Sequence, residues 1–160
     1  MPFVLDLVRH AEAEAAGDAG DAPRALSGGG RRAMAVLAET LAKESWRPDR
    51  IFSSPLLRAR QTAEILRGGA PGAPAIEGME ELHPDAEPSD TVLALRQHGA
   101  LAGHVVLVTH QPLAGRLVAL LAAEASSFKP GTLVRIEFAA DVVPGHGRVM
   151  RAIQPERADR

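Results

Sequence analysis

Cysteine and tyrosine are absent from this chain of 160 residues, and aromatic side chains make up only 3% of it. The lack of cysteine excludes disulfides, thiolate nucleophiles, cysteine-ligated zinc and iron–sulfur clusters. It also favours an intracellular setting. The shortage of aromatic side chains argues against stacking platforms for single-stranded nucleic acid.

The chain also lacks any long apolar run and any large excess of charge. No stretch approaches the roughly 20 residues of a membrane span, and Met1-Pro2 leads directly into a strand-like run without room for a signal peptide. The formal net charge of −2 argues against a sequence-independent hold on nucleic acid. We therefore expect a cytoplasmic protein with neither a membrane nor a nucleic-acid partner.

Short apolar runs alternate with helical patterns along the chain, which predicts a parallel sheet covered by helices. We expect one α/β domain over residues 1–153, a three-layer α/β/α sandwich with a mostly parallel central sheet, followed by a polar tail at 154–160. The strand-like runs are 3–8, 50–54, 104–109, 132–138 and 147–153, and the helical patterns are 27–44, 54–68, 89–97 and 112–121.

Capping residues predict where three of the helices begin. Ser27 and Ser89 are typical N-caps, and Ser54-Pro55 predicts a helix with proline at its first position. Asp6 interrupts the first apolar strand, and the pattern leaves open whether its carboxylate is paired inside or exposed at an edge.

Cationic and imidazole side chains gather where the predicted strands end. Arg9 and His10 follow the first strand, and His110 follows the strand at 104–109. Arg58 lies one turn into a helix that itself begins at a strand end. Because ligands bind beyond the carboxyl ends of parallel strands, these four residues predict a site for a compact anion. Arginine grips phosphoryl oxygens bidentately, so a phosphoryl group is the natural ligand.

Three segments in this order resemble the histidine phosphatase (phosphoglycerate mutase-like) superfamily. They are "LVRHAE", "SSPLLRARQTAE" and "VTHQPLAG", accompanied by "RALSGGGRRA" and "EELHP". The resemblance extends from Phe3 to about Leu121, and within the superfamily the chain is most similar to SixA-type phosphohistidine phosphatases. It departs from the usual pattern at Ala11, where most members have glycine. The stretch from Arg67 to His104 also leaves no room for the helical cap of the larger members.

The resemblance implies a role for each matching residue. His10 would attack phosphorus and become a phosphohistidine, while Arg9, Arg58 and His110 would hold the phosphoryl oxygens. Glu81 falls where many members place a proton donor, although Glu80 or no residue at all remain alternatives, and a solvated acidic pair is as good an explanation. No cofactor or metal is expected, and no His-x-His or H-E-x-x-H pair exists.

A histidine nucleophile must be neutral, with one ring nitrogen bare and the other donating to a fixed acceptor. We expect that acceptor to be a backbone carbonyl within residues 12–20, and we expect adjacent cations to lower the pKa of His10. A bound dianion would favour the protonated form of His110. We expect His83 to be structural and His98, His104 and His146 to be surface groups.

The expected function is hydrolysis of a phosphorylated protein side chain, most plausibly phosphohistidine on a histidine-phosphotransfer protein. An imidazole leaving group needs little help from an acid, and an uncovered rim admits a side chain displayed on another protein. Two alternatives stay open: a small-molecule phosphomonoesterase of the same fold, acting on a sugar phosphate or nucleotide derivative, and a phosphate-binding module without turnover.

Overall fold

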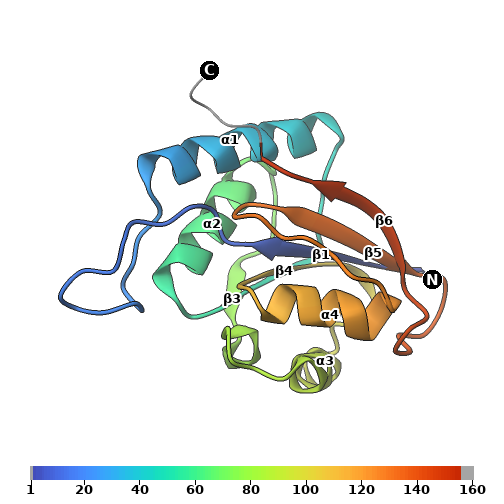
Figure 1. Ribbon diagram of the computed structural model, residues 1–160. Helices are drawn as coiled ribbons and strands as arrows, with labels where there is room; N and C mark the ends of the chain where they lie inside the picture. The colour runs from blue at the N-terminus through green and yellow to red at the C-terminus, as the bar shows by residue number, and fades with distance from the viewer. Residues whose placement is uncertain (1, 156–160) are drawn as a thin grey trace.

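A six-stranded mixed sheet forms the centre of the computed structural model, which describes residues 2–155 (Figure 1). The strand order is β3-β2-β4-β1-β5-β6, and the first four of these are parallel. β5 runs antiparallel to β1, and β6 runs antiparallel to β5. The strands are β1 (Phe3–Arg9), β2 (Arg50–Ser53), β3 (Ile76–Gly78), β4 (Gly103–Thr109), β5 (Leu133–Phe138) and β6 (Arg148–Ile153).

Helices cover both faces of the sheet and complete three layers, as the sequence predicts (Figure 1). Two separate apolar cores, one on each face, hold the layers together because consecutive side chains of a strand point to opposite faces. Leu7 of β1 packs into the core under α3 and α4, whereas Val8 packs into the core under α1 and α2. The helices are α1 (Gly28–Lys43), α2 (Leu57–Gly68), the 3-10 helix η1 (Glu80–Leu82), α3 (Pro88–Gln97) and α4 (Leu113–Ala122).

The starts of the helices agree with the sequence prediction at α1 and differ at α2 and α3. Ser27 caps α1, and its hydroxyl accepts from the amide of Gly30 at 3.0 Å. The prediction at Ser54-Pro55 is wrong, because α2 begins at Leu57 after a turn in which the Ser54 hydroxyl accepts from the amide of Leu56.

The prediction that Ser89 caps α3 is also wrong by two residues. Glu87 is the N-cap of α3, and Pro88 occupies its first position. Proline suits that position because its fixed φ is helical and the N–H it lacks has no partner there. Proline thus sets this boundary although serine is the stronger capping residue.

The carboxyl-terminal strands β5 and β6 form an antiparallel pair, with a register shift between Arg135 and Ile136. The short edge strand β3 was not expected from the sequence, because three residues are too few to show an alternating pattern. The predicted polar tail begins after Ile153, and its residues 156–160 lie outside the described part of the chain. Among residues 2–155, every helix is too short or too polar to cross a bilayer.

Candidate active site

Two histidines meet at the carboxyl ends of the neighbouring strands β1 and β4. His10 follows β1 and His110 follows β4, and Arg9 and Thr109 are paired in the register of these strands. The amide of His10 donates to the carbonyl of Thr109 at 3.0 Å, which ties the two strand ends together. The two imidazole rings are 5.0 Å apart between centroids and inclined by 57°.

The imidazole of His10 is held by a single backbone hydrogen bond. Its Nδ1 lies 2.7 Å from the carbonyl oxygen of Ala11, and because a carbonyl only accepts, Nδ1 must carry the proton. The other nitrogen, Nε2, is therefore left with its lone pair. The predicted acceptor within residues 12–20 is wrong, because the chain turns inward at Ala11, whose amide donates to the Thr62 hydroxyl.

Arg58 lies beside the bare nitrogen of His10. It is the second residue of α2 and is only 5% exposed, and its Nε is 3.4 Å from Nε2 of His10. The two Nη groups contact Asp21, one on the backbone carbonyl at 3.2 Å and one on Oδ2 at 3.0 Å. Thr62 donates its hydroxyl proton to the carbonyl of Arg58, and this bond couples the arginine to the Ala11 turn.

His110 is buried, at 1% exposed, and is held by Ser54. Its Nε2 lies 2.7 Å from the Ser54 hydroxyl, while its Nδ1 is buried without a hydrogen-bond partner among the described residues. Sequence reasoning missed Ser54 as a site residue and assigned it to a helix start. The only signal for it was its place within the segment that also carries Arg58.

Arg9 is half-buried and is turned toward the loop before β5. Its Nη1 donates to the carbonyl of Phe128 at 2.8 Å, and its Nε is buried without a partner in the described part of the chain. The charge of Arg9 acts on His10 and lowers the pKa of that imidazole. The structure therefore brings Arg9, His10, Arg58 and His110 together.

Glu81 lies on the segment that borders these four residues, but no hydrogen bond from the described residues fixes its carboxylate. It is half-buried in η1, and its carboxylate forms no hydrogen bond to another residue between 2 and 155, whereas Glu80 is exposed. The segment is anchored at the rim because the Thr109 hydroxyl donates to the carbonyl of Leu82 at 2.6 Å. The role of Glu81 as proton donor thus remains a prediction.

Burial keeps both site histidines neutral. Burial is the largest cause that lowers the pKa of His10 to about 4, with smaller contributions from Arg58 and Arg9, against a hydrogen bond to Ala11 that raises it. Burial also lowers the pKa of His110 to about 3, assisted by the charges of His10 and Arg58. The adjacent cations that we expected to lower the pKa of His10 do so, but desolvation contributes more.

These pKa values predict the pH dependence of catalysis. If His10 is the nucleophile, protonation of His10 does not lower kcat/KM for an aryl phosphate between pH 8 and 5. The value of kcat/KM falls only as the pH drops through about 4, where His10 takes up its proton. The profile is corrected for the titration of the substrate. Circular dichroism at each pH is the control for unfolding. A histidine takes up its proton near pH 6.5 in the unfolded chain but near pH 4 in the folded one, so the free energy of unfolding decreases as the pH falls between these values. A His10-dependent loss near pH 6.5 in folded protein would contradict the prediction.

A second polar cluster surrounds Asp6 in the middle of β1. The fully buried carboxylate accepts from Arg135 at 2.8 and 2.9 Å, from the Trp46 indole at 2.8 Å and from His104 at 2.6 Å. Burial would raise the pKa of Asp6, but the hydrogen bonds from Arg135 and His104 outweigh it and lower the pKa to about 2. Asp6 is therefore an ionised, internally paired group.

His104 is a partner of this buried carboxylate, so the prediction that His104 is a surface group is wrong. His98 and His146 are exposed as expected.

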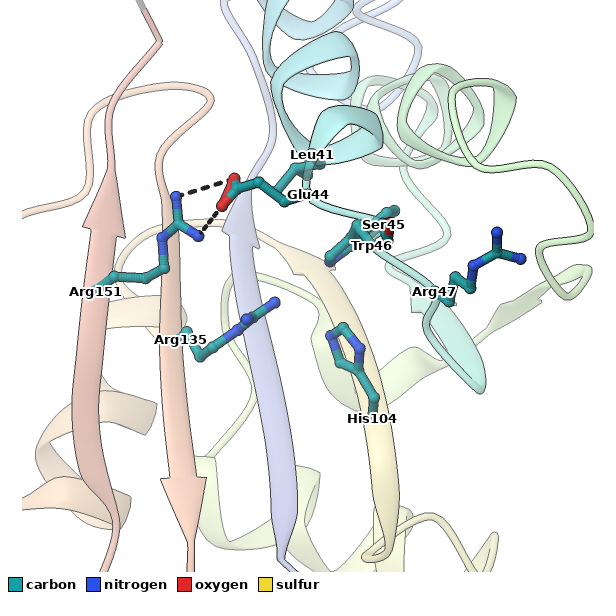
Figure 2. A pocket seen from close by; sticks show the side chains of 8 residues that line it. All are labelled: Leu41, Glu44, Ser45, Trp46, Arg47, His104, Arg135 and Arg151. Carbon is teal, nitrogen blue, oxygen red and sulfur yellow. Dashed lines mark hydrogen bonds and ion pairs between the residues drawn. The ribbon is translucent and has the colours of Figure 1, made fainter.

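A cavity of about 200 Å³ adjoins this cluster (Figure 2). His104 is the second residue of β4 and His110 follows its last, so the cavity and the two site histidines lie toward opposite ends of the sheet. Arg135 is already paired with Asp6, and Figure 2 shows Arg151 bound to the carboxylate of Glu44. We assign this cluster to stability. Among residues 2–155, no group of three or more His, Asp or Glu side chains is placed to hold a metal ion.

Half of the chain matches a known protein family. The model of the histidine phosphatase superfamily (branch 1) matches residues 5–84, which is half of the chain. The protein belongs to the histidine phosphatase superfamily, as its motifs suggested, and is a phosphatase of that superfamily. No curated protein sequence matches the chain.

Solved structures of SixA proteins are similar over nearly the full chain. The protein histidine phosphatase SixA complexed with tungstate is 27% identical, with a TM-score of 0.81 over 95% of this chain and 97% of that one. SixA from Agrobacterium tumefaciens is 26% identical, with a TM-score of 0.78 over 97% and 99%. A mycobacterial glucosyl-3-phosphoglycerate phosphatase, at 17% identity and a TM-score of 0.68 over 94% and 98%, shares the fold.

Proposed function

We propose that this protein removes the phosphoryl group from phosphohistidine side chains of other proteins through a covalent intermediate on His10. The observation that supports this most directly is the arrangement of His10 itself. Its proton is held on Nδ1 by Ala11, and its bare Nε2 faces the guanidinium of Arg58. A nucleophile, a cation for the phosphoryl oxygens and a second imidazole are thus within one small space.

In the first step the lone pair of His10 Nε2 forms a bond to phosphorus as the bond from phosphorus to the leaving imidazole nitrogen breaks. That nitrogen takes a proton from solvent or from Glu81, where the family resemblance places a donor. In the second step a water oxygen attacks phosphorus, the bond to Nε2 breaks, and the proton of the water leaves to solvent as phosphate is released. His10 returns to its neutral form with Nδ1 still donating to Ala11.

The cations of the site would stabilise the charge on the phosphoryl oxygens during both steps. Arg58 is nearest to the attacking nitrogen, and Arg9 contributes its charge from the adjacent position. His110 is neutral in the free protein because it is buried. A dianion beside it favours its protonated form, and its unpartnered Nδ1 is then a further donor for a phosphoryl oxygen.

The lack of a firmly positioned proton donor among the described residues favours phosphohistidine as the substrate. The carboxylate of Glu81 is held by no hydrogen bond from the described residues, and an imidazole leaves from a phosphoramidate with less help than an alkoxide needs. The segment between α2 and β4 contains only β3, η1 and α3, so no helical cap covers the rim. The likeness to SixA proteins at 26–27% identity points the same way.

One observation favours the alternative of a small phosphomonoester. Asp21 contacts Arg58 from the loop at 13–25, and a loop that approaches the site is suited to enclosing a small substrate. The fold is also shared with a glucosyl-3-phosphoglycerate phosphatase.

Turnover of a phosphorylated histidine-phosphotransfer protein, compared with a panel of sugar phosphates and nucleotides, separates the two functions. We expect kcat/KM for the phosphoprotein to exceed that for every small phosphomonoester. Release of phosphate is measured by the same assay for all substrates, and the His10→Ala variant provides the background. A preference for a sugar phosphate or nucleotide would replace the proposed substrate with a small molecule.

A further inference from the structure

Asp21 contacts both terminal nitrogens of Arg58, the pair that can grip two oxygens of a phosphoryl group. Its Oδ2 accepts from Nη2 of Arg58 at 3.0 Å, and its backbone carbonyl accepts from Nη1 at 3.2 Å. The remaining nitrogen, Nε, faces His10. Each of the three guanidinium nitrogens therefore makes one hydrogen bond, two of them to one aspartate, so a phosphoryl group that binds both Nη nitrogens side by side competes with Asp21 for them.

The segment that carries Asp21 has few other contacts with the body of the protein. Residues 14–23 are all exposed, and Asp21 itself is 59% exposed in its side chain. The segment is tied at its base, where the amide of Glu14 donates to the carbonyl of Ala25 at 2.8 Å. Figure 1 shows it as the blue loop that extends outward beyond α2. The tip can therefore move away from Arg58 without disturbing the core.

The contact between Asp21 and Arg58 has a physical cause in the charge of Arg58. Arg58 is almost fully buried, and a buried cation without a counter-charge is costly. The carboxylate of Asp21 supplies that counter-charge, and its second oxygen also pairs with Arg24 at 3.0 Å. Asp21 thus stabilises the free protein with the same nitrogens that a bound oxyanion would use.

We propose that Asp21 is an internal competitor for the phosphoryl group and thereby sets the affinity of this site for its substrate. The inference rests on the proposed function, because it takes the phosphoryl site to be the one formed by His10, Arg58 and His110. Binding then requires exchange of the carboxylate for the phosphoryl oxygens, so the observed affinity is the intrinsic affinity multiplied by the fraction of molecules with Arg58 free.

The Asp21→Asn variant tests this, with tungstate as the probe and p-nitrophenyl phosphate as the substrate. We expect the inhibition constant of tungstate and the KM to fall together by roughly 2- to 5-fold, the range for release of a partly exposed charge pair. We also expect the melting temperature of the free variant to fall, and the rise in melting temperature on adding tungstate to be larger than in the wild type.

The matched control is Asp18→Asn, which removes an equal charge from the same exposed segment at a residue without a contact to Arg58. It should leave the inhibition constant near the wild-type value. An unchanged or higher constant in Asp21→Asn, with an active wild type, would overturn the inference and make Asp21 a residue that positions Arg58. A wild type that neither binds tungstate nor hydrolyses the substrate would instead refute the proposed function.

Discussion

Replacing His10 with alanine is expected to lower the turnover of p-nitrophenyl phosphate by at least about 10⁴-fold, the scale seen when a covalent nucleophile is removed. The reason is that Nε2 of His10 lies beside the guanidinium of Arg58, where a phosphoryl group would be held. Its Nδ1 proton is held by Ala11, so only Nε2 is available for attack. Binding of tungstate should persist in the variant, because Arg58 and His110 remain.

Trapping of the intermediate gives the same prediction a second readout. Brief mixing with a radiolabelled phosphohistidine protein should leave an alkali-stable, acid-labile label on the wild type and none on His10→Ala. His98→Ala is the matched control, since His98 is an exposed histidine at the end of α3. A wild type that binds tungstate but shows neither label nor turnover would identify a phosphate-binding module without catalysis.

Replacing Arg58 with alanine is expected to lower kcat/KM by about 10²- to 10³-fold, the typical effect of losing one preorganised group that stabilises transition-state charge. Lysine at this position should recover only part of the loss, because an ammonium lacks the planar fork that engages two oxygens at once. The charge of Arg58 also lowers the pKa of His10, so the acid limb of the pH profile should move upward in Arg58→Ala.

Arg60→Ala is the control for this prediction. Arg60 is exposed on the same helix two residues later, so the variant removes an equal charge from α2 without touching the site. Steady-state kinetics of both variants across pH give the two readouts. An equal loss in Arg58→Ala and Arg60→Ala, or an unmoved acid limb in Arg58→Ala, would show that Arg58 does not act on the nucleophile.

Local patterns in the chain were sufficient for the architecture. The apolar run of β4 and the helical spacing of α1 and α4 each follow from side chains near in sequence, and their alternation predicts parallel strands with helices on both faces. The predicted start of α2 was wrong because other interactions use the residue that the sequence pattern assigned to the helix start. At α2 the hydroxyl of Ser54 is used by a turn and by His110, and the helix begins three residues later.

The four residues at the rim were also predictable, because a strand end is a local feature and parallel strands place such ends side by side. His10 and His110 are 100 positions apart in the chain, yet each directly follows its strand. Their pKa values are lowered mainly by burial, and burial is a property of the packed protein. The sequence predicted a lowered pKa only for His10, and from adjacent cations rather than from burial.

Two residues that escaped prediction, Asp21 and Ser54, share one property: each acts through a partner distant in the sequence. Asp21 meets Arg58 across 37 positions and Ser54 meets His110 across 56, and neither residue type signals such a pairing. The proposed site was thus contained in short motifs, since its histidines and arginines lie at strand and helix ends. Which groups hold or compete for those side chains was decided only by tertiary packing, because a hydrogen bond between distant segments depends on how the layers and loops meet.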